Sequence, residues 1–293
     1  MVVALLRRRG VNSKLIQALD GFRFWCVAEV RYMLKILKRR VKTRFIADAE
    51  WEAAKSDTFK AYDGSGCLPY LRRCLDLFER TRKAKYVTDF EEFVFESSVE
   101  DFCDVEGADV VVSTIHKSKG REFDDVFMLV PSADSSDDQR RRLLYVGMTR
   151  AKRRLFVHTD GGEFDRLPVD RVVDDTASYA PPDEVSLQLT HKDVNLGFFN
   201  GRKREVLAVR SGAPLVFNGS CLLSPDGVPV AMLSKSMMAR LSSWRECGYV
   251  VVSASARFVV SWRPKGAPPG EPEAAVLLAD LALSRVGRPE LAN

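Results

Sequence analysis

The chain has 293 residues, of which 46% are hydrophobic and 29% charged, so it is long enough to bury a core and to form about two domains. No run approaches the roughly 18 consecutive apolar residues of a membrane-spanning helix, and the apolar start is too short for a signal sequence, so we expect a cytoplasmic protein without a membrane partner. A formal charge of +5 permits a polyanionic partner but does not require one. The six cysteines lack C-x-x-C pairs and neighbouring histidines, which predicts reduced thiols and no metal site.

Residues 1 to about 106 are predicted to be mainly helical. Apolar side chains recur at helical spacing in two stripes, which comprise Val30, Met33, Leu34 and Leu37, and then Leu71, Cys74, Leu75 and Phe78. These stripes predict helix faces that pack in a core. The apolar start runs directly into the three arginines at 7–9 without an N-capping residue, so we expect the chain to begin partway through a domain.

The pattern then alternates between strands and a helix. Apolar runs at 110–114, 126–130 and 154–159 are predicted strands, and residues 137–152 have the periodicity of a helix. This alternation is typical of an α/β fold with a parallel sheet and covering helices. Because the apolar runs are continuous, they predict strands buried on both faces, with functional loops at their ends.

Residues 161–182 are rich in Asp, Gly, Ser and Pro and are a predicted linker. Beyond them, short apolar runs separated by turns, one of them at 206–209, predict a small, mostly β accessory domain with one helix near 236–247. We therefore predict a domain of residues 1–160, the linker, and a β-rich domain of residues 183–293.

A polar loop between two of the predicted strands is the most informative stretch. It carries Thr114, His116, Lys119, Gly120 and Glu122. A hydroxyl, an imidazole and a lysine at the end of a strand can hold phosphates, a nearby carboxylate can accept a ribose hydroxyl, and a glycine permits close approach of the backbone. A loop between core strands rarely needs so many polar groups merely to turn, so the pattern indicates a ligand site.

Arg150 lies near the end of the predicted helix, shortly before the next strand. Its planar and permanently charged guanidinium suits the charge that develops on a transferred phosphoryl group. We interpret Tyr145 on the same helix as a packing residue with a polar tip. Arg141 and Arg142 are as consistent with a solvated helix face as with a functional role.

Two of these segments resemble a known family. Thr-Ile-His-Lys-Ser-Lys-Gly-Arg-Glu-Phe at 114–123 and Tyr-Val-Gly-Met-Thr-Arg-Ala at 145–151 resemble motifs V and VI of the UvrD/Rep/PcrA superfamily 1 DNA helicases. A weaker similarity, to the segment after motif IV, covers Gly21-Phe-Arg-Phe and residues 28–34. The resemblance spans about residues 1–160 and implies a RecA-like second motor domain that closes over ATP in a 3′-to-5′ DNA helicase, with the pathway, DNA repair or another, left open.

By motif position, the resemblance implies a role for each candidate residue. Arg150 would be the catalytic arginine finger. ATP would be contacted by Gly120, Glu122, Gly147 and Arg150, and single-stranded DNA by Thr114, His116 and Lys119.

The chain also departs from the family pattern. No G-x-x-x-x-G-K-[ST] occurs in it, so it lacks the loop that grips the β and γ phosphates, and the family's Mg²⁺-binding acidic strand is missing too. We expect ATP and Mg²⁺ to be bound mainly by a P-loop-bearing amino-terminal helicase half, and this chain to be inactive without that partner. Residues 40–108 would be a reduced form of the family's inserted domain.

The sequence leaves alternative functions open. The chain could be a non-catalytic nucleic-acid-binding or protein-interaction module on a helicase scaffold, or a truncated helicase remnant, and its substrate could be RNA in place of DNA.

Overall fold

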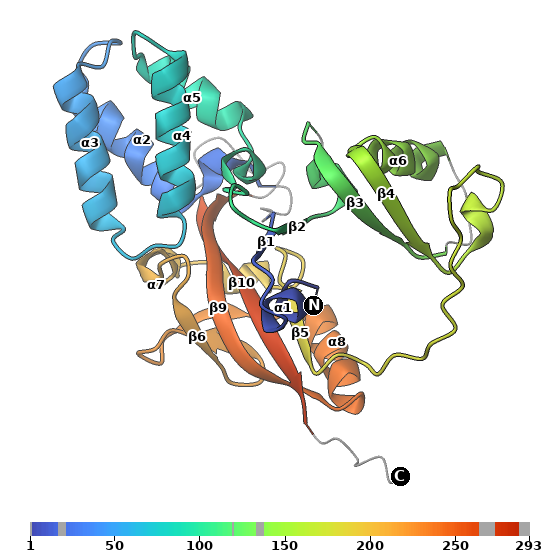
Figure 1. Cartoon of the computed structure of the whole chain (residues 1–293). Helices are drawn as coiled ribbons and strands as arrows, with labels where there is room; N and C mark the ends of the chain where they lie inside the picture. Colours follow the sequence, from blue (N-terminus) through green and yellow to red (C-terminus); the bar gives the residue numbers. More distant parts are fainter. Residues whose placement is uncertain (1, 17–21, 119, 133–137, 264–272, 287–293) are drawn as a thin grey trace. The chain divides into compact units, whose positions relative to one another are not determined.

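The computed structural model describes residues 2–16, 22–118, 120–132, 138–263 and 273–286 (Figure 1). Contacts within the chain divide it into two compact units. The larger unit contains residues 17–106 and 182–293, and the smaller unit contains Val2–Ile16 and Gly107–Pro181. No helix in the described part of the chain is long and apolar enough to cross a bilayer.

Helices make up the first part of the larger unit. The described elements are η1 (Phe24–Cys26), α2 (Ala28–Arg40), α3 (Asp48–Ala61), α4 (Leu68–Thr81), α5 (Val87–Glu96) and η2 (Val99–Phe102). Both predicted apolar stripes are confirmed, because all of their residues are buried on α2 and α4. The rings of Trp51, Phe78 and Phe90 pack against one another with centroids 5.1–5.6 Å apart, which joins α3, α4 and α5 in one core.

A curled antiparallel sheet makes up the second part of the larger unit, with strand order β5-β10-β9-β6-β7-β8. The strands are β5 (Glu184–Gln188), β6 (Pro214–Phe217), β7 (Cys221–Leu223), β8 (Pro229–Met232), β9 (Tyr249–Trp262) and β10 (Ala274–Arg285), and the helical elements are η5 (Leu196–Phe199), α7 (Lys203–Ala208) and α8 (Lys235–Glu246). The long β9–β10 ladder, visible in Figure 1, has register shifts at Leu278/Ala279 and Ala282/Leu283. Such irregularities increase the local twist of a strand and bend it.

The predicted helix near 236–247 is confirmed by α8, whereas the predicted strand at 206–209 is wrong. Val206 lies in α7, and Val206 and Val209 are both buried. Their separation of three residues is the spacing of one helical face. A four-residue apolar run does not distinguish a helix from a strand, and the polar residues 203–205 supply the first turn of this one.

One buried core runs through both parts of the larger unit. Val27, just before α2, forms an antiparallel bridge with Val260 of β9, and the buried apolar cluster includes residues of the helices and of the sheet. The contacts therefore group helices α2 to α5 with the C-terminal sheet, although the predicted linker lies between them in the sequence. The predicted division into domains of residues 1–160 and 183–293 stays a prediction.

The smaller unit is an α/β arrangement of two small parallel sheets. Its described elements are α1 (Val2–Arg8), β1 (Ser13–Leu15), β2 (Val110–Val112), η3 (Ile115–Ser118), β3 (Phe123–Val130), α6 (Asp138–Met148), β4 (Ala151–Thr159) and η4 (Gly162–Phe164). β1 pairs with β2 and β3 pairs with β4, both in parallel, so the predicted strand-helix-strand alternation is confirmed. The described strands form two separate pairs, and a single RecA-like sheet stays a prediction.

The predicted burial of the strands on both faces is wrong for β3. Met128 and Val130 are buried, whereas Phe127 and Leu129 are 65% and 68% exposed. Phe127 stacks on Phe156 of β4 with centroids 4.5 Å apart. Because side chains alternate along a strand, only the face of β3 that packs against α6 is buried. A continuous apolar run in the sequence does not show which of its side chains are exposed.

Candidate functional site

The polar loop after β2 is shaped by backbone hydrogen bonds. The carbonyl oxygen of Thr114 accepts hydrogen bonds from the amides of Lys117 at 3.1 Å and Ser118 at 3.2 Å, and the Ser118 hydroxyl donates to the Ile115 carbonyl at 2.8 Å. Ser118 is buried beneath this turn, while the side chains of Thr114 and His116 are exposed. The turn therefore presents a hydroxyl and an imidazole to solvent on a fixed backbone.

The second half of the loop turns at Gly120. Lys119, a predicted DNA contact, lies outside the described residues. Gly120 has φ of +80°, and no atom lies within 4 Å of the position that a Cβ would take. Glycine is therefore favoured at this position by the left-handed backbone conformation. A close approach of the loop to other parts of the chain is not the reason.

Arg150 connects this loop to the end of α6. Its Nη1 donates to the carbonyl of Arg121 at 3.1 Å, its Nε to the carbonyl of Val146 at 2.9 Å, and its Nη2 to the Thr149 hydroxyl at 3.0 Å. Its own carbonyl accepts a hydrogen bond from the Phe123 amide at 2.9 Å. The structure thus brings together the two segments that the sequence singled out, and it places a half-buried guanidinium at their junction.

Glu122 is much less constrained. Its carboxylate is 59% exposed and lies 3.8 Å from the Lys152 ammonium, a distance and exposure at which an ion pair contributes little. By contrast, Arg154 donates to both carboxylate oxygens of Asp125, at 2.8 Å to Oδ1, and this hydrogen bonding lowers the pKa of Asp125 below its ordinary value. The carboxylate of Asp125 is therefore committed to Arg154, whereas that of Glu122 remains accessible to a ligand.

Gly147 is buried in the packing of α6. A Cβ at this position would lie 2.9 Å from Met128 Cε and 3.1 Å from Ile115 Cδ1. The glycine therefore lets α6 lie close to β3 and to the polar loop, and this packing sets where Arg150, three residues later, meets the loop.

Replacing Gly147 by leucine should destabilise the smaller unit by about 1–3 kcal/mol, because the side chain overfills the space beside Met128 and Ile115. Gly147→Ala should be nearly neutral. The two atoms nearest to the new methyl group are the ends of flexible side chains, which can move aside, and alanine stabilises a helix by about 1 kcal/mol relative to glycine. Amide hydrogen exchange of β3 and α6 measures both effects. If the amides are equally protected from exchange in the leucine variant and the parent chain, Gly147 has no packing role. Adding Met128→Ala to the leucine variant should restore part of the lost protection, because it makes room for the leucine.

Other residues of α6 differ in their surroundings. Tyr145 is 64% exposed, so its predicted packing role is wrong: it lies on the face of α6 opposite the one that meets β3 at Gly147. Arg141 is 71% exposed, 3.8 Å from Asp138, and Arg142 is also exposed, which agrees with the solvated alternative.

One segment of the smaller unit matches a known protein family. Residues 109–158 match the family model for the UvrD-like helicase C-terminal domain. This segment of the chain is similar to the C-terminal domain of UvrD-like helicases. The resemblance that the two motif segments indicate is thereby confirmed, and Thr114, His116 and Arg150 all lie within the matched UvrD-like segment.

Curated proteins that are similar to the chain carry helicase names. It is similar to ATP-dependent DNA helicase srs2 of Schizosaccharomyces pombe, with 24% identity over 164 residues, covering 53% of the chain and 17% of the relative. It is similar to a probable DNA helicase II homolog of Rickettsia felis (31% over 140 residues, 39% of the chain and 21% of the relative) and to ATP-dependent DNA helicase Rep of Buchnera aphidicola (34% over 85 residues, 25% and 13%). The chain thus spans about a fifth or less of the length of these relatives.

The donor set of the UvrD-like segment suits a phosphate-bearing ligand. Arg150 supplies a permanent positive charge, and the exposed hydroxyl of Thr114 and the imidazole of His116 supply hydrogen-bonding groups. Within the described residues there is no group of three or more His, Cys, Asp or Glu side chains that could hold a metal ion. The residues therefore fit an anion better than a cation.

Proposed function

We propose that this chain is the C-terminal motor half of an ATP-dependent 3′-to-5′ DNA helicase. The observation that carries the proposal is the junction at Arg150, where hydrogen bonds join the loop of motif V to the end of the motif VI helix. An arginine that is fixed between two such segments can move with them when a motor domain closes over nucleotide. Its charge then meets the phosphoryl group in the transition state rather than in the ground state.

In this proposal, the ATP phosphates and Mg²⁺ are gripped by a P-loop-bearing amino-terminal half, because the present sequence contains no P-loop motif. When bound there, ATP supplies the phosphoryl transfer that drives translocation. Arg150 stabilises the developing charge, Glu122 accepts a hydrogen bond from the ribose, and Gly120 and Gly147 keep the backbone around Arg150 in place. The chain without that half does not hydrolyse ATP.

Single-stranded DNA is the proposed second ligand of the smaller unit. Thr114 and His116 are exposed on the turn after β2, and Lys119 follows them in the same loop. Hydroxyl, imidazole and ammonium groups donate hydrogen bonds to phosphate oxygens without reading base sequence. This arrangement suits a motor that must hold successive nucleotides of any sequence.

The test is an ATPase assay with single-stranded DNA, run on this chain alone, on a P-loop-bearing amino-terminal helicase half alone, and on their mixture. Activity well above the sum of the separate parts is the expected result. A strand-displacement assay on duplexes with a 3′ or a 5′ tail then measures polarity, and unwinding from the 3′ tail is expected. A mixture no more active than its parts would overturn the motor-half proposal.

A non-catalytic nucleic-acid-binding module is the second candidate, and one observation favours it. Each of the three guanidinium nitrogens of Arg150 donates a hydrogen bond within the smaller unit, so the side chain holds the loop in place whether or not a nucleotide is bound. If the mixture stays inert while the chain binds single-stranded DNA with strong salt dependence, this candidate replaces the motor half.

A further inference from the structure

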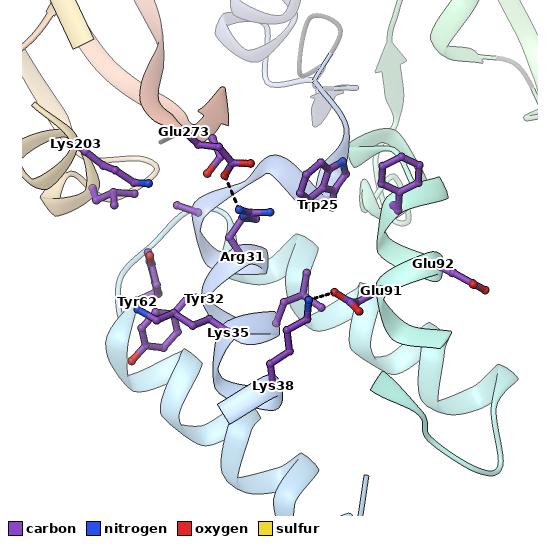
Figure 2. Close-up of a pocket in the computed structure, with 15 residues that line it drawn as sticks. Trp25, Arg31, Tyr32, Lys35, Lys38, Tyr62, Glu91, Glu92, Lys203 and Glu273 are labelled. Atoms are coloured by element: carbon purple, nitrogen blue, oxygen red, sulfur yellow. Dashed lines mark hydrogen bonds and ion pairs between the residues drawn. The ribbon is translucent and has the colours of Figure 1, made fainter. Parts of the chain in front are cut away.

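The larger unit contains a groove that has no part in the proposed motor function. It has a volume of about 640 Å³ and lies beside α2, between α5, α7 and the adjoining ends of β9 and β10 (Figure 2). Its charged and aromatic lining residues include Trp25, Arg31, Tyr32, Lys35, Lys38, Tyr62, Glu91, Glu92, Phe95, Lys203 and Glu273. All of its lining residues fall outside the UvrD-like segment at 109–158.

Aromatic rings and arginines form one wall of this groove. The Arg31 guanidinium lies 4.8 Å from the centroid of the Trp25 ring, and the rings of Trp25 and Phe95 are 5.7 Å apart. The guanidinium of Arg23, which is not itself a lining residue, lies over the Phe95 ring at 5.1 Å from its centroid. Phe95 is nevertheless 50% exposed, although a phenylalanine gains by burial. The exposed Arg23 guanidinium lies over this ring, and a planar ligand group can take its place there.

Cations run along the floor of the groove. Arg31, Lys35 and Lys38 recur at i, i+4 and i+7 on one face of α2, and Lys203 faces them from α7 (Figure 2). Each helical interval of four residues spans about 6 Å. The groove therefore offers a row of positive charges alongside its aromatic wall.

The acidic residues of the groove compensate only some of these charges. Arg31 pairs with Glu273 at 2.5 Å and Lys38 pairs with Glu91, as the dashed lines in Figure 2 mark. Lys35 and Lys203 form no ion pair with any residue that the structure describes, and Glu92 points away from Lys35 and Lys38 in Figure 2. The lining contains four cationic side chains and three carboxylates, so the net charge of the groove is positive.

We propose that this groove binds single-stranded nucleic acid, with phosphates along Lys35 and Lys203 and a base stacked on Phe95. Proteins that bind single strands without sequence preference combine cations that follow the backbone with aromatic rings on which bases stack. A duplex keeps its bases stacked within itself and could not use the ring. The binding requires neither ATP nor an amino-terminal helicase half, so the proposal does not depend on the motor function.

The test measures the affinity of the complete chain for a fluorescently labelled 20-nucleotide oligothymidylate, without ATP, by anisotropy at several salt concentrations. Phe95→Ala and Lys35→Glu should each weaken binding by about tenfold, within the range reported for loss of a stacking ring. Lys35→Glu should also lower the slope of log affinity against log salt by at least about 0.7, the value for one lost phosphate contact with a single strand. A duplex of the same length should bind more weakly to the parent chain.

Matched controls come from the same helical region. Phe45 is also 50% exposed and Lys83 is exposed, and neither lines the groove, so Phe45→Ala and Lys83→Glu should bind like the parent chain. Circular dichroism checks that each variant remains folded. Unchanged affinity in both Phe95→Ala and Lys35→Glu overturns the groove proposal. If His116→Ala weakens binding in that case, the strand is held by the smaller unit alone, and the motor proposal survives independently.

Discussion

Arg150→Ala should reduce the single-stranded-DNA-dependent ATPase rate of the mixture with an amino-terminal helicase half by about 10³- to 10⁵-fold. The reason is that an arginine finger acts on charge that appears only in the transition state, so its loss lowers kcat without a matching rise in KM for ATP. The measurement is steady-state ATP hydrolysis at saturating DNA. The proposed assignment of Arg150 as the catalytic residue depends on this result.

Arg150 also has a structural role, since it donates to the carbonyl of Arg121 in the polar loop. Arg150→Lys separates the two roles, because lysine keeps the charge but not the planar fork. We expect Arg150→Lys to bind DNA and to associate with the amino-terminal half normally while its kcat remains at least about 10²-fold low. A lysine variant with normal kcat, or an alanine variant that loses only DNA binding, would contradict the finger assignment and leave Arg150 as a residue that braces the loop.

The sequence predicted those features that depend on local pattern. Buried positions on α2 and α4 follow from helical spacing, because each such helix needs one apolar face whatever it packs against. The match of this region to a helicase family model follows from the motif-like segments at 114–123 and 145–151, while the ligand contacts of the loop stay a prediction. Arg150 lies just before β4, and its predicted catalytic role stays a prediction.

Features that depend on contacts between residues far apart in the sequence could not be predicted from local sequence patterns. The groove of the larger unit unites Trp25, Phe95 and Glu273, which no spacing connects, and the resemblance to motifs V and VI directed attention elsewhere. The exposure of Phe127 depends on what covers β3 and not on the strand itself. The packing of Gly147 against Met128 and Ile115 was likewise not visible in the sequence, and its predicted contact with ATP stays a prediction.

Glu29→Ala should lower the free energy of unfolding of the larger unit by about 2–4 kcal/mol, the largest effect on stability that we expect from a polar residue. Glu29 is only 1% exposed on α2, and its Oε1 accepts hydrogen bonds from the hydroxyls of Ser65 at 2.6 Å and Ser211 at 3.0 Å. Ser65 precedes α4 and Ser211 precedes β6, so this carboxylate links the helices to the sheet. Alanine leaves a cavity and two buried hydroxyls without their acceptor.

The companion variant Glu29→Gln should stay within about 1 kcal/mol of the parent chain, because its amide oxygen can still accept from both serines. It also replaces the buried Oε2, which has no hydrogen-bond partner among the described residues, by an uncharged group. All four tryptophans lie in the larger unit, so urea unfolding followed by tryptophan fluorescence reports on this unit alone. Glu52→Ala, at an exposed position on α3, should change the unfolding free energy by less than about 0.5 kcal/mol. If Glu29→Ala proves as mild as Glu52→Ala, the apolar contacts around Val27 and Val260 suffice to hold helices and sheet together, and the buried carboxylate has no role in joining them.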